Sequence, residues 1–241
     1  MFLDEFEELA RAAPEMVCLE FIDGRLEVWP TPDRGHLTAL MRITDACRHL
    51  RPELDLHLSC RVKMGEGGSG RAWLDGALAP ADYFDGDATD GGEWADPDGV
   101  LMAVTVAMCT DRRDPDALRD AYAMAGIPVY LVVDRADRSA TVFFDPMDGR
   151  YRSATMCAFG NTLRLPEPVG INLRTAVFAG LAARPGGPVR VTAEIAAERL
   201  ADLREAQGAG SDEEAVREAV MEAARRIRPH ETSDAIGQEK P

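Results

Sequence analysis

Lysine is almost absent from this sequence of 241 residues. Only Lys63 and Lys240 occur, so arginine supplies nearly all of the positive charge. Arginine stays protonated and presents a planar fork of donors, so it does not readily replace a lysine that gives or takes a proton. The sequence therefore excludes a catalytic lysine anywhere between these two positions.

Positive charge as a whole is also scarce. The net charge is −15, and residues 1–180 alone carry 30 Asp and Glu against 18 Arg and Lys. Binding to the phosphate backbone of nucleic acid depends on Lys and Arg side chains that neutralise phosphates. The acidic balance makes nucleic acid a doubtful partner, although a local basic patch is compatible with it.

Paired cysteines and long apolar runs are missing as well. The five cysteines are dispersed without a CxxC pair, which fits small core residues in a reducing compartment better than a zinc or disulfide framework. No apolar run approaches the roughly 20 residues of a membrane helix. The first ten residues, MFLDEFEELA, lack the basic start and apolar centre of a signal peptide. We therefore expect a cytoplasmic protein without membrane contact.

The clearest pattern in the sequence lies within residues 99–134. Leu101–Met108 is an apolar, β-branched run of strand length, and Val129–Val133 is a second one. Between them, Ala117–Ala125 has helical spacing, and Asp114 followed by proline resembles a helix start. This order predicts a strand, a helix and a strand. A parallel pair of such strands needs a right-handed crossover.

Elsewhere in residues 1–181 the pattern predicts two further helices and several strands. The helices span Phe2–Ala13 and His36–Leu50, and the strands span Val17–Ile22, Leu26–Trp29, Leu54–Val62, Ala72–Leu78, Ala140–Phe144, Tyr151–Cys157, Leu163–Leu165 and Val169–Leu173. We expect one mixed sheet that includes the last two strands. On the second helix we expect Leu37, Leu40, Ile43 and Ala46 or Cys47 to face the core. We also expect the fourth strand to be interrupted at Asp75–Gly76.

The character of the sequence changes after residue 181. Residues 182–190 form a linker rich in proline and glycine, residues 191–228 a helical C-terminal segment, and residues 229–241 a disordered tail. The helical segment holds two narrow apolar stripes, over residues 192–207 and 211–227. These helices could pair with each other, dock on the domain or join a second copy. We expect a homodimer.

Several short motifs in residues 1–180 follow one another in a recognisable order. They are Glu20-Phe21-Ile22-Asp23-Gly24, His36, Gly99-Val100-Leu101-Met102, Asp111-Arg112-Arg113-Asp114, Ala121-Tyr122-Ala123 through Gly126-Ile127-Pro128-Val129-Tyr130-Leu131, and Leu165-Pro166-Glu167-Pro168-Val169-Gly170. In order and spacing they resemble the Uma2 family, described as restriction endonucleases with a PD-(D/E)XK nuclease fold. The resemblance implies an α/β (α+β) core with a mixed sheet, to which the C-terminal helical segment is an appendage.

The resemblance also implies a catalytic chemistry. Such nucleases hold Mg²⁺ with carboxylates on adjacent strands, and a lysine orients and deprotonates the attacking water. In the family pattern an acid lies on the first hairpin and an Asp on a later strand. By this correspondence Glu20 and Asp75 keep the two acidic positions, where they would bind a metal weakly, if at all. His36 is either a helix-start residue or a site residue near Glu20.

At two further positions of the family pattern the ionisable side chain is replaced by an uncharged one. Thr105 falls where the family has a Glu in the central strand, and Leu118 falls where it has a Lys in the following helix. No carboxylate occurs between Gly99 and Thr110, so the loss of the Glu does not depend on the alignment. The resemblance therefore implies an endonuclease, while the missing Glu and Lys argue against DNA hydrolysis.

Three hypotheses remain open from the sequence. The protein is a pseudo-nuclease that serves as a binding scaffold, a nuclease fold with a small-molecule pocket, or an active endonuclease. Only the last requires a cofactor, Mg²⁺. In each case we expect Glu20, Asp75, Thr105 and Leu118 to converge on one cleft. A closed cleft supports the scaffold, and a deep apolar cleft supports the ligand pocket.

Overall fold

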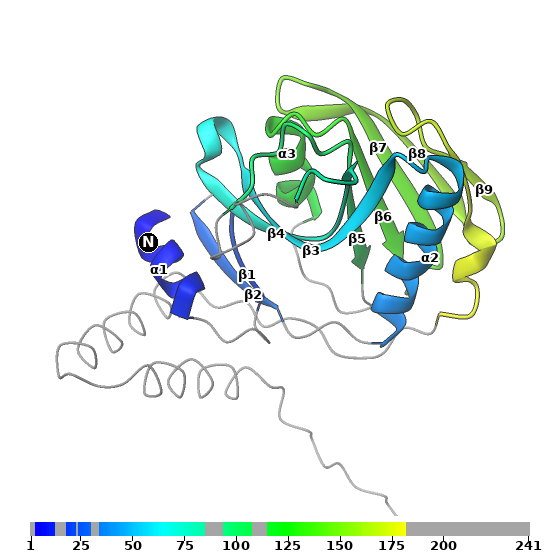
Figure 1. Cartoon of the computed structure of the whole chain (residues 1–241), viewed down its shortest axis with the longest axis horizontal. Coiled ribbons are helices and arrows are strands. Elements are labelled where there is room, and N and C mark those ends of the chain that lie inside the picture. The colour runs from blue at the N-terminus through cyan, green and yellow to red at the C-terminus, as the bar shows by residue number, and fades with distance from the viewer. Residues whose placement is uncertain are drawn as a thin grey trace, which may run out of the picture.

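A computed structural model of the chain describes residues 3–12, 18–22, 24–29, 34–84, 94–107 and 115–181 (Figure 1). The helical elements are α1 (Leu3–Ala12), α2 (Arg34–Leu50), α3 (Pro115–Met124) and two 3₁₀ turns, η1 (Glu66–Gly68) and η2 (Thr175–Phe178). The strands are β1 (Cys18–Ile22), β2 (Arg25–Trp29), β3 (Leu54–Met64), β4 (Gly70–Pro80), β5 (Met102–Ala107), β6 (Val129–Asp134), β7 (Ser139–Met147), β8 (Arg150–Ala158), β9 (Thr162–Arg164) and β10 (Asn172–Arg174).

Eight of the strands form one mixed sheet. Its order is β2-β1-β4-β5-β6-β7-β8, with β3 paired to β4 beside this path. Among the described strands of this sheet, β5 and β6 are the one parallel pair, and α3 connects them. This confirms the predicted strand-helix-strand unit and the predicted mixed α/β fold class.

The end of α3 also follows the prediction from the sequence. Gly126 has a φ of 75°, and its N–H bonds to the carbonyl of Ala123 at 3.1 Å. The N–H of Ile127 bonds to the carbonyl of Tyr122, also at 3.1 Å. This pair of bonds is the Schellman arrangement that a glycine after a helix permits, and it returns the chain toward β6.

The prediction for the last two strands is wrong. They were expected to complete the main sheet, but β9 and β10 pair only with each other, antiparallel, as a separate two-stranded sheet. Their inward residues Leu163 and Leu173 pack against one face of the main sheet, in the same core cluster as residues of α2. Local alternation in such short strands does not say which sheet they join.

Two core clusters lie on the two faces of the sheet. In β5, Met102, Val104 and Val106 belong to one cluster and Ala103 to the other, as alternating side chains require. The first cluster includes α2 and the β9–β10 sheet, and the second includes Leu118 and Tyr122 of α3. In Figure 1, α2 and the β9 segment lie at one end of the molecule, and α1 lies at the other.

Two core positions predicted from the sequence are wrong: Leu37, and Leu58, which the alternation of apolar residues over Leu54–Val62 predicts on the buried face of a strand. Leu37 is 46% exposed, because the buried face of α2 is instead formed by His36, Ala39, Leu40, Ile43 and Cys47. Leu58 is 41% exposed, because Ser59 has a φ of 57° and interrupts the alternation of β3. After Ser59 the inward residues of β3 pass from the first core cluster to the second.

Other predictions fall outside the described residues. These are the N-cap at Asp114, the linker 182–190, the helical segment 191–228 and the tail 229–241. Across the described ranges, no helix has both the length and the apolar character to span a membrane.

Candidate active site

Asp75 lies in β4 where pairing between β4 and β5 ends. The paired residues run from Leu78↔Met102 to Gly76↔Val104. One residue beyond, the Asp75 side chain continues the connection, because its Oδ2 accepts a hydrogen bond from the N–H of Val106 at 2.8 Å. The carboxylate thus replaces a backbone acceptor where the two strands separate.

The predicted interruption of the strand at Asp75–Gly76 is wrong, because β4 runs without a break from Gly70 to Pro80, but its pairing with β3 is irregular at this point. Leu58 pairs with Gly76 and Cys60 with Leu74, but the residues between them, Ser59 and Asp75, form no pair. A Cβ on Gly76 would meet the Leu56 side chain at 3.2 Å, so this close packing favours glycine. Strand β4 continues past the unpaired residue Asp75. The Asp75 side chain contacts Val106 of β5 and His36 of α2.

His36 reaches Asp75 from the first turn of α2. Its side chain is 4% exposed, and its Nε2 lies 3.5 Å from Oδ1 of Asp75, whose side chain is 12% exposed. The contact becomes an ion pair only when the imidazole is protonated. The two Asp75 oxygens therefore face a ring nitrogen and a backbone N–H.

Glu20 is held in a similar way on the other side of β4. Its Oε1 accepts a hydrogen bond from the N–H of Trp73 at 3.1 Å, and the residue is 1% exposed. Strands β1 and β4 pair only at Phe21↔Arg71, so this carboxylate also bridges two strands beyond their backbone pairing. Because a buried carboxylate is costly without donors, the N–H of Trp73 helps to retain Glu20 there.

Thr105 of β5 and Leu118 of α3 lie in apolar surroundings. Thr105 is 4% exposed, and its Oγ1 accepts a hydrogen bond from the Tyr130 hydroxyl at 3.2 Å. Leu118 is also 4% exposed and packs in the cluster that contains Tyr122 and Tyr130. The rings of these tyrosines meet edge to face with centroids 4.8 Å apart. Neither position offers a charged group.

The structure thus brings some of the candidate residues together. His36 contacts Asp75, and Glu20 is held two residues away from Asp75 along β4. Within the described part of the chain, no hydrogen bond or ion pair joins Thr105 to Asp75. That all four positions of the family pattern, the two retained and the two lost, converge on one cleft stays a prediction.

Sequence reasoning missed Tyr130 and the amide of Val106. A tyrosine inside the apolar strand β6 signals that its hydroxyl needs a partner. The parallel register, which pairs Tyr130 with Ala103, brings that hydroxyl within reach of Thr105 two residues along β5. The register between β5 and β6, which the sequence does not give, is needed to identify Thr105 as the partner of the Tyr130 hydroxyl.

These residues do not fit a magnesium centre. Mg²⁺ prefers six oxygen ligands in octahedral geometry. Among the residues that the structure describes, no three His, Cys, Asp or Glu side chains are grouped closely enough to hold a metal ion. Oδ2 of Asp75 accepts the N–H of Val106, Oδ1 lies 3.5 Å from Nε2 of His36, and the position of the family's Glu holds a hydroxyl bonded to another hydroxyl. No catalytic step through a metal follows from this arrangement.

A cavity of about 770 Å³ lies elsewhere, between α2 and the segment from Gly170 to Val177. None of Glu20, His36, Asp75, Thr105 and Leu118 lines it. The candidate site is therefore distinct from this cavity.

Comparison with known proteins agrees with the fold. A model of the Uma2 family, described as "Putative restriction endonuclease", matches residues 3–177. No curated protein matches the chain. The chain resembles the crystal structure of a "putative nuclease belonging to DUF820" from Anabaena variabilis ATCC 29413, with a TM-score of 0.54 and 13% sequence identity. The match covers 74% of this chain and 97% of that one, and at this identity it speaks for the fold alone.

Proposed function

The chain belongs to the Uma2 family of restriction-endonuclease-like proteins, and from that premise we propose that it is a pseudo-nuclease. In this proposal the protein keeps the nuclease fold as a binding scaffold and does not cleave DNA. One observation carries the proposal: Glu20 and Asp75, the two retained acids, serve as acceptors for backbone N–H groups of neighbouring strands. In each residue one carboxylate oxygen is thereby bound to the sheet, where it stabilises the strands.

The two lost positions support the same conclusion. The metal of a nuclease polarises the phosphoryl group and stabilises the leaving oxygen, and a lysine acts on the attacking water. Thr105 bonds to Tyr130, and Leu118 is buried in an apolar cluster, so neither supplies that chemistry. Removing one electrostatic group of this kind typically costs about 10²–10³-fold in rate. Losing two leaves little activity.

Burial favours a scaffold over a small-molecule pocket at this site. Glu20, His36, Thr105 and Leu118 are each less than 5% exposed. A ligand site of ordinary size needs a concave volume of about 300–1,000 Å³. The cavity of about 770 Å³ is lined by other residues, and the burial of these four side chains supports a closed framework at the candidate site.

The test is a nicking assay on supercoiled DNA with the unmodified protein in Mg²⁺ and in Mn²⁺. We expect no cleavage above background. The matched variant is Asp75→Asn, which keeps an acceptor oxygen for Val106 while removing the charge. Metal-dependent nicking by the unmodified protein that disappears in Asp75→Asn would overturn the proposal and establish an active endonuclease.

Restoring the lost groups tests the proposal from the other side. The double variant Thr105→Glu with Leu118→Lys supplies the carboxylate and the ammonium that the family pattern contains. Burying both charges is costly unless they pair, so circular dichroism must first show that the variant folds. Metal-dependent nicking by the folded double variant alone would support the loss of activity in the natural chain.

Binding to DNA is a separate measurement. With a net charge of −15, we expect fluorescence anisotropy with a labelled duplex to detect no binding tighter than the non-specific range, about 10⁻⁴–10⁻⁶ M at physiological salt. Tight, salt-dependent binding would show that a local basic patch recognises DNA. The scaffold would then have a nucleic-acid partner.

A further inference from the structure

A groove runs between α2 and the segment that follows β9, and its volume is about 770 Å³. One wall is the second half of α2, with Ala46 and Leu50. The other wall is β10 and η2, with Leu173 and Val177. Leu50 is 49% exposed and Val177 is 39% exposed, so both walls present apolar side chains to the groove.

The two walls are tied together, which makes the groove a built feature of the fold. The Arg42 guanidinium donates a hydrogen bond to the carbonyl of Val177. Nη1 of Arg51 donates to the carbonyls of Pro168 and Val169, at 3.0 and 2.7 Å. These bonds hold the helix to the loop before β10 and to η2.

The rim of the groove carries more positive than negative groups. Arg42 and Arg174 line it, together with His49, and Asp45 is the acidic residue among the lining side chains. Both Asp45 and Arg174 are exposed. In a protein whose net charge is −15, such a local excess of arginine favours an acidic occupant.

The described part of the chain ends beside this groove. Val177 belongs to η2, and the N–H of Leu181 bonds to the carbonyl of Phe178 at 3.0 Å. Leu181 is buried in the same core cluster as Leu40 and Ile43 of α2. The sixty residues that follow in the sequence therefore start next to the groove.

We propose that the predicted helix over residues 192–207 of the same chain docks in this groove. Its apolar stripe, with Ile195, Leu200 and Leu203, matches the apolar walls. Its carboxylates recur at i, i+4, i+8 and i+11 on a face that borders the stripe at Asp202, where a carboxylate is placed to meet an arginine of the rim. They are Glu194, Glu198, Asp202 and Glu205.

The connection is long enough for this docking. The ten residues 182–191 span at most about 33–36 Å when extended. The seventeen residues of α2 are about 26 Å long at 1.5 Å per residue. The connection therefore spans the length of the groove, and docking there gives the apolar stripe of residues 192–207 a partner in the same chain.

Hydrogen exchange of the full chain, measured by mass spectrometry, tests the docking. We expect the amides of residues 192–207 to exchange at least about tenfold more slowly in the natural chain than in Leu203→Asp, which places a charge in the stripe. Val177→Asp, on the groove wall, should remove the same protection. Combining both substitutions should add nothing further.

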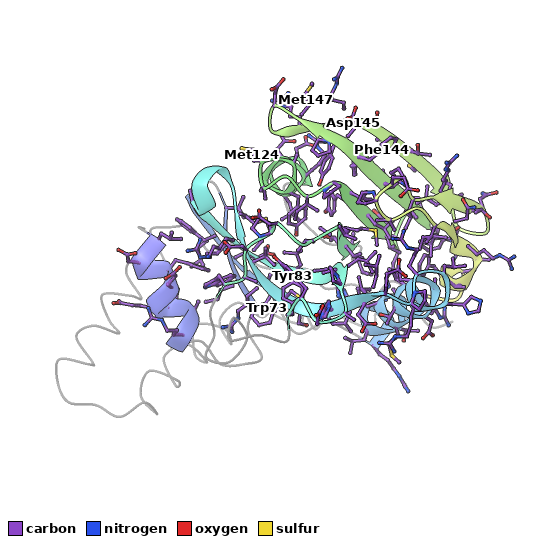
Figure 2. All side chains as sticks on the ribbon, turned by 45° about the horizontal axis from the view of Figure 1, so that its top comes forward. Trp73, Tyr83, Met124, Phe144, Asp145 and Met147 are labelled. Atoms are coloured by element: carbon purple, nitrogen blue, oxygen red, sulfur yellow. The ribbon has the colours of Figure 1, made fainter. Side chains whose placement is uncertain are left out.

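Two variants serve as controls. Ala201→Asp changes the opposite side of the predicted helix, and Met147→Asp changes an exposed side chain of β7 far from α2 (Figure 2). Both should keep the protection. Amides 192–207 that exchange like an unstructured chain, or protection that survives Val177→Asp, would overturn the proposal.

Light scattering separates docking within one chain from docking between copies. We expect the protection of residues 192–207 to be independent of protein concentration, and the mass of the particle to be the same for Leu203→Asp and the natural chain. Protection that weakens on dilution, together with a mass halved by Leu203→Asp, would show that the helix occupies the groove of a second copy. That result would overturn docking in the same chain.

Discussion

The Asp75 carboxylate accepts the N–H of Val106 at 2.8 Å, directly beyond the last backbone pair between β4 and β5. A side chain thus completes the connection that the backbone leaves open. Here Oδ2 joins the two central strands, and the other carboxylate oxygen, Oδ1, lies 3.5 Å from Nε2 of His36 in α2.

The first prediction follows from this bond. Asp75→Ala leaves the N–H of Val106 without its acceptor and should lower the free energy of unfolding by about 1–3 kcal/mol. Asp75→Asn keeps one acceptor oxygen and should cost less. Urea unfolding with an unchanged m-value measures both.

A surface aspartate provides the control for this series. Asp96 pairs with Lys63 at 2.9 Å, and its side chain is 65% exposed. Because exposed pairs contribute little, Asp96→Ala should change the free energy of unfolding by less than about 0.5 kcal/mol. Equal effects of Asp75→Ala and Asp96→Ala would contradict a structural role for Asp75.

Elements with local signals were predictable from the sequence. The β1–β2 hairpin turns at Gly24, which has a φ of 74°, and Gly126 ends α3 with a φ of 75°. In both cases the glycine permits a backbone conformation that other residues rarely adopt. The apolar runs of β5 and β6 likewise predicted two buried strands, which the structure confirms as a parallel pair.

Features that depend on contacts between distant segments were not predictable. The exposure of Leu58 results from the positive φ of Ser59, which no local pattern indicates. The separate β9–β10 sheet depends on where the chain meets the core. At the candidate site the sequence identified residue types, but the bonding of Asp75 to Val106 and of Thr105 to Tyr130 depends on strand register.

The second prediction concerns the Thr105–Tyr130 pair. Thr105→Val and Tyr130→Phe should each reduce the free energy of unfolding by about 0.5–1.5 kcal/mol, because each leaves a buried hydroxyl without this bond. The double variant should cost less than the sum, since both single changes remove the same interaction. Strict additivity in a double-mutant cycle would mean that the two hydroxyls do not interact.

The third prediction concerns assembly. We expect a homodimer that forms through the second predicted helix, residues 211–227, whose stripe holds Val216 and Val220. Removing residues 211–241 should convert the dimer to a monomer while leaving residues 192–207 in place. Light scattering across a range of concentrations measures the mass. A natural chain that is monomeric throughout would refute the dimer, and a dimer unaffected by the deletion would place the interface elsewhere.

The last prediction concerns the thiols of the two core clusters. Cys47 is 0% exposed in the first cluster and Cys60 is 8% exposed in the second. Burial raises the pKa of each thiol to about 12. In the unfolded chain a cysteine has a pKa of about 8.5. Between these two values the folded protein therefore binds more protons than the unfolded chain.

Stability linked to these thiols is fully present below the unfolded pKa and falls as the pH rises toward 12. Each pH unit well above the unfolded pKa costs up to about 1.4 kcal/mol for each thiol. We expect ionisation of the two thiols together to lower the free energy of unfolding by roughly 2 kcal/mol between pH 9 and pH 10.

Urea unfolding at a series of pH values measures how steeply the free energy of unfolding falls with pH. The reference protein is the double variant Cys47→Ala with Cys60→Ala. The variant starts from a lower stability because it loses buried side chains, so the comparison rests on the slopes. Titration of the remaining groups is common to both proteins, and equal slopes would show that neither thiol is protected from ionisation by the fold.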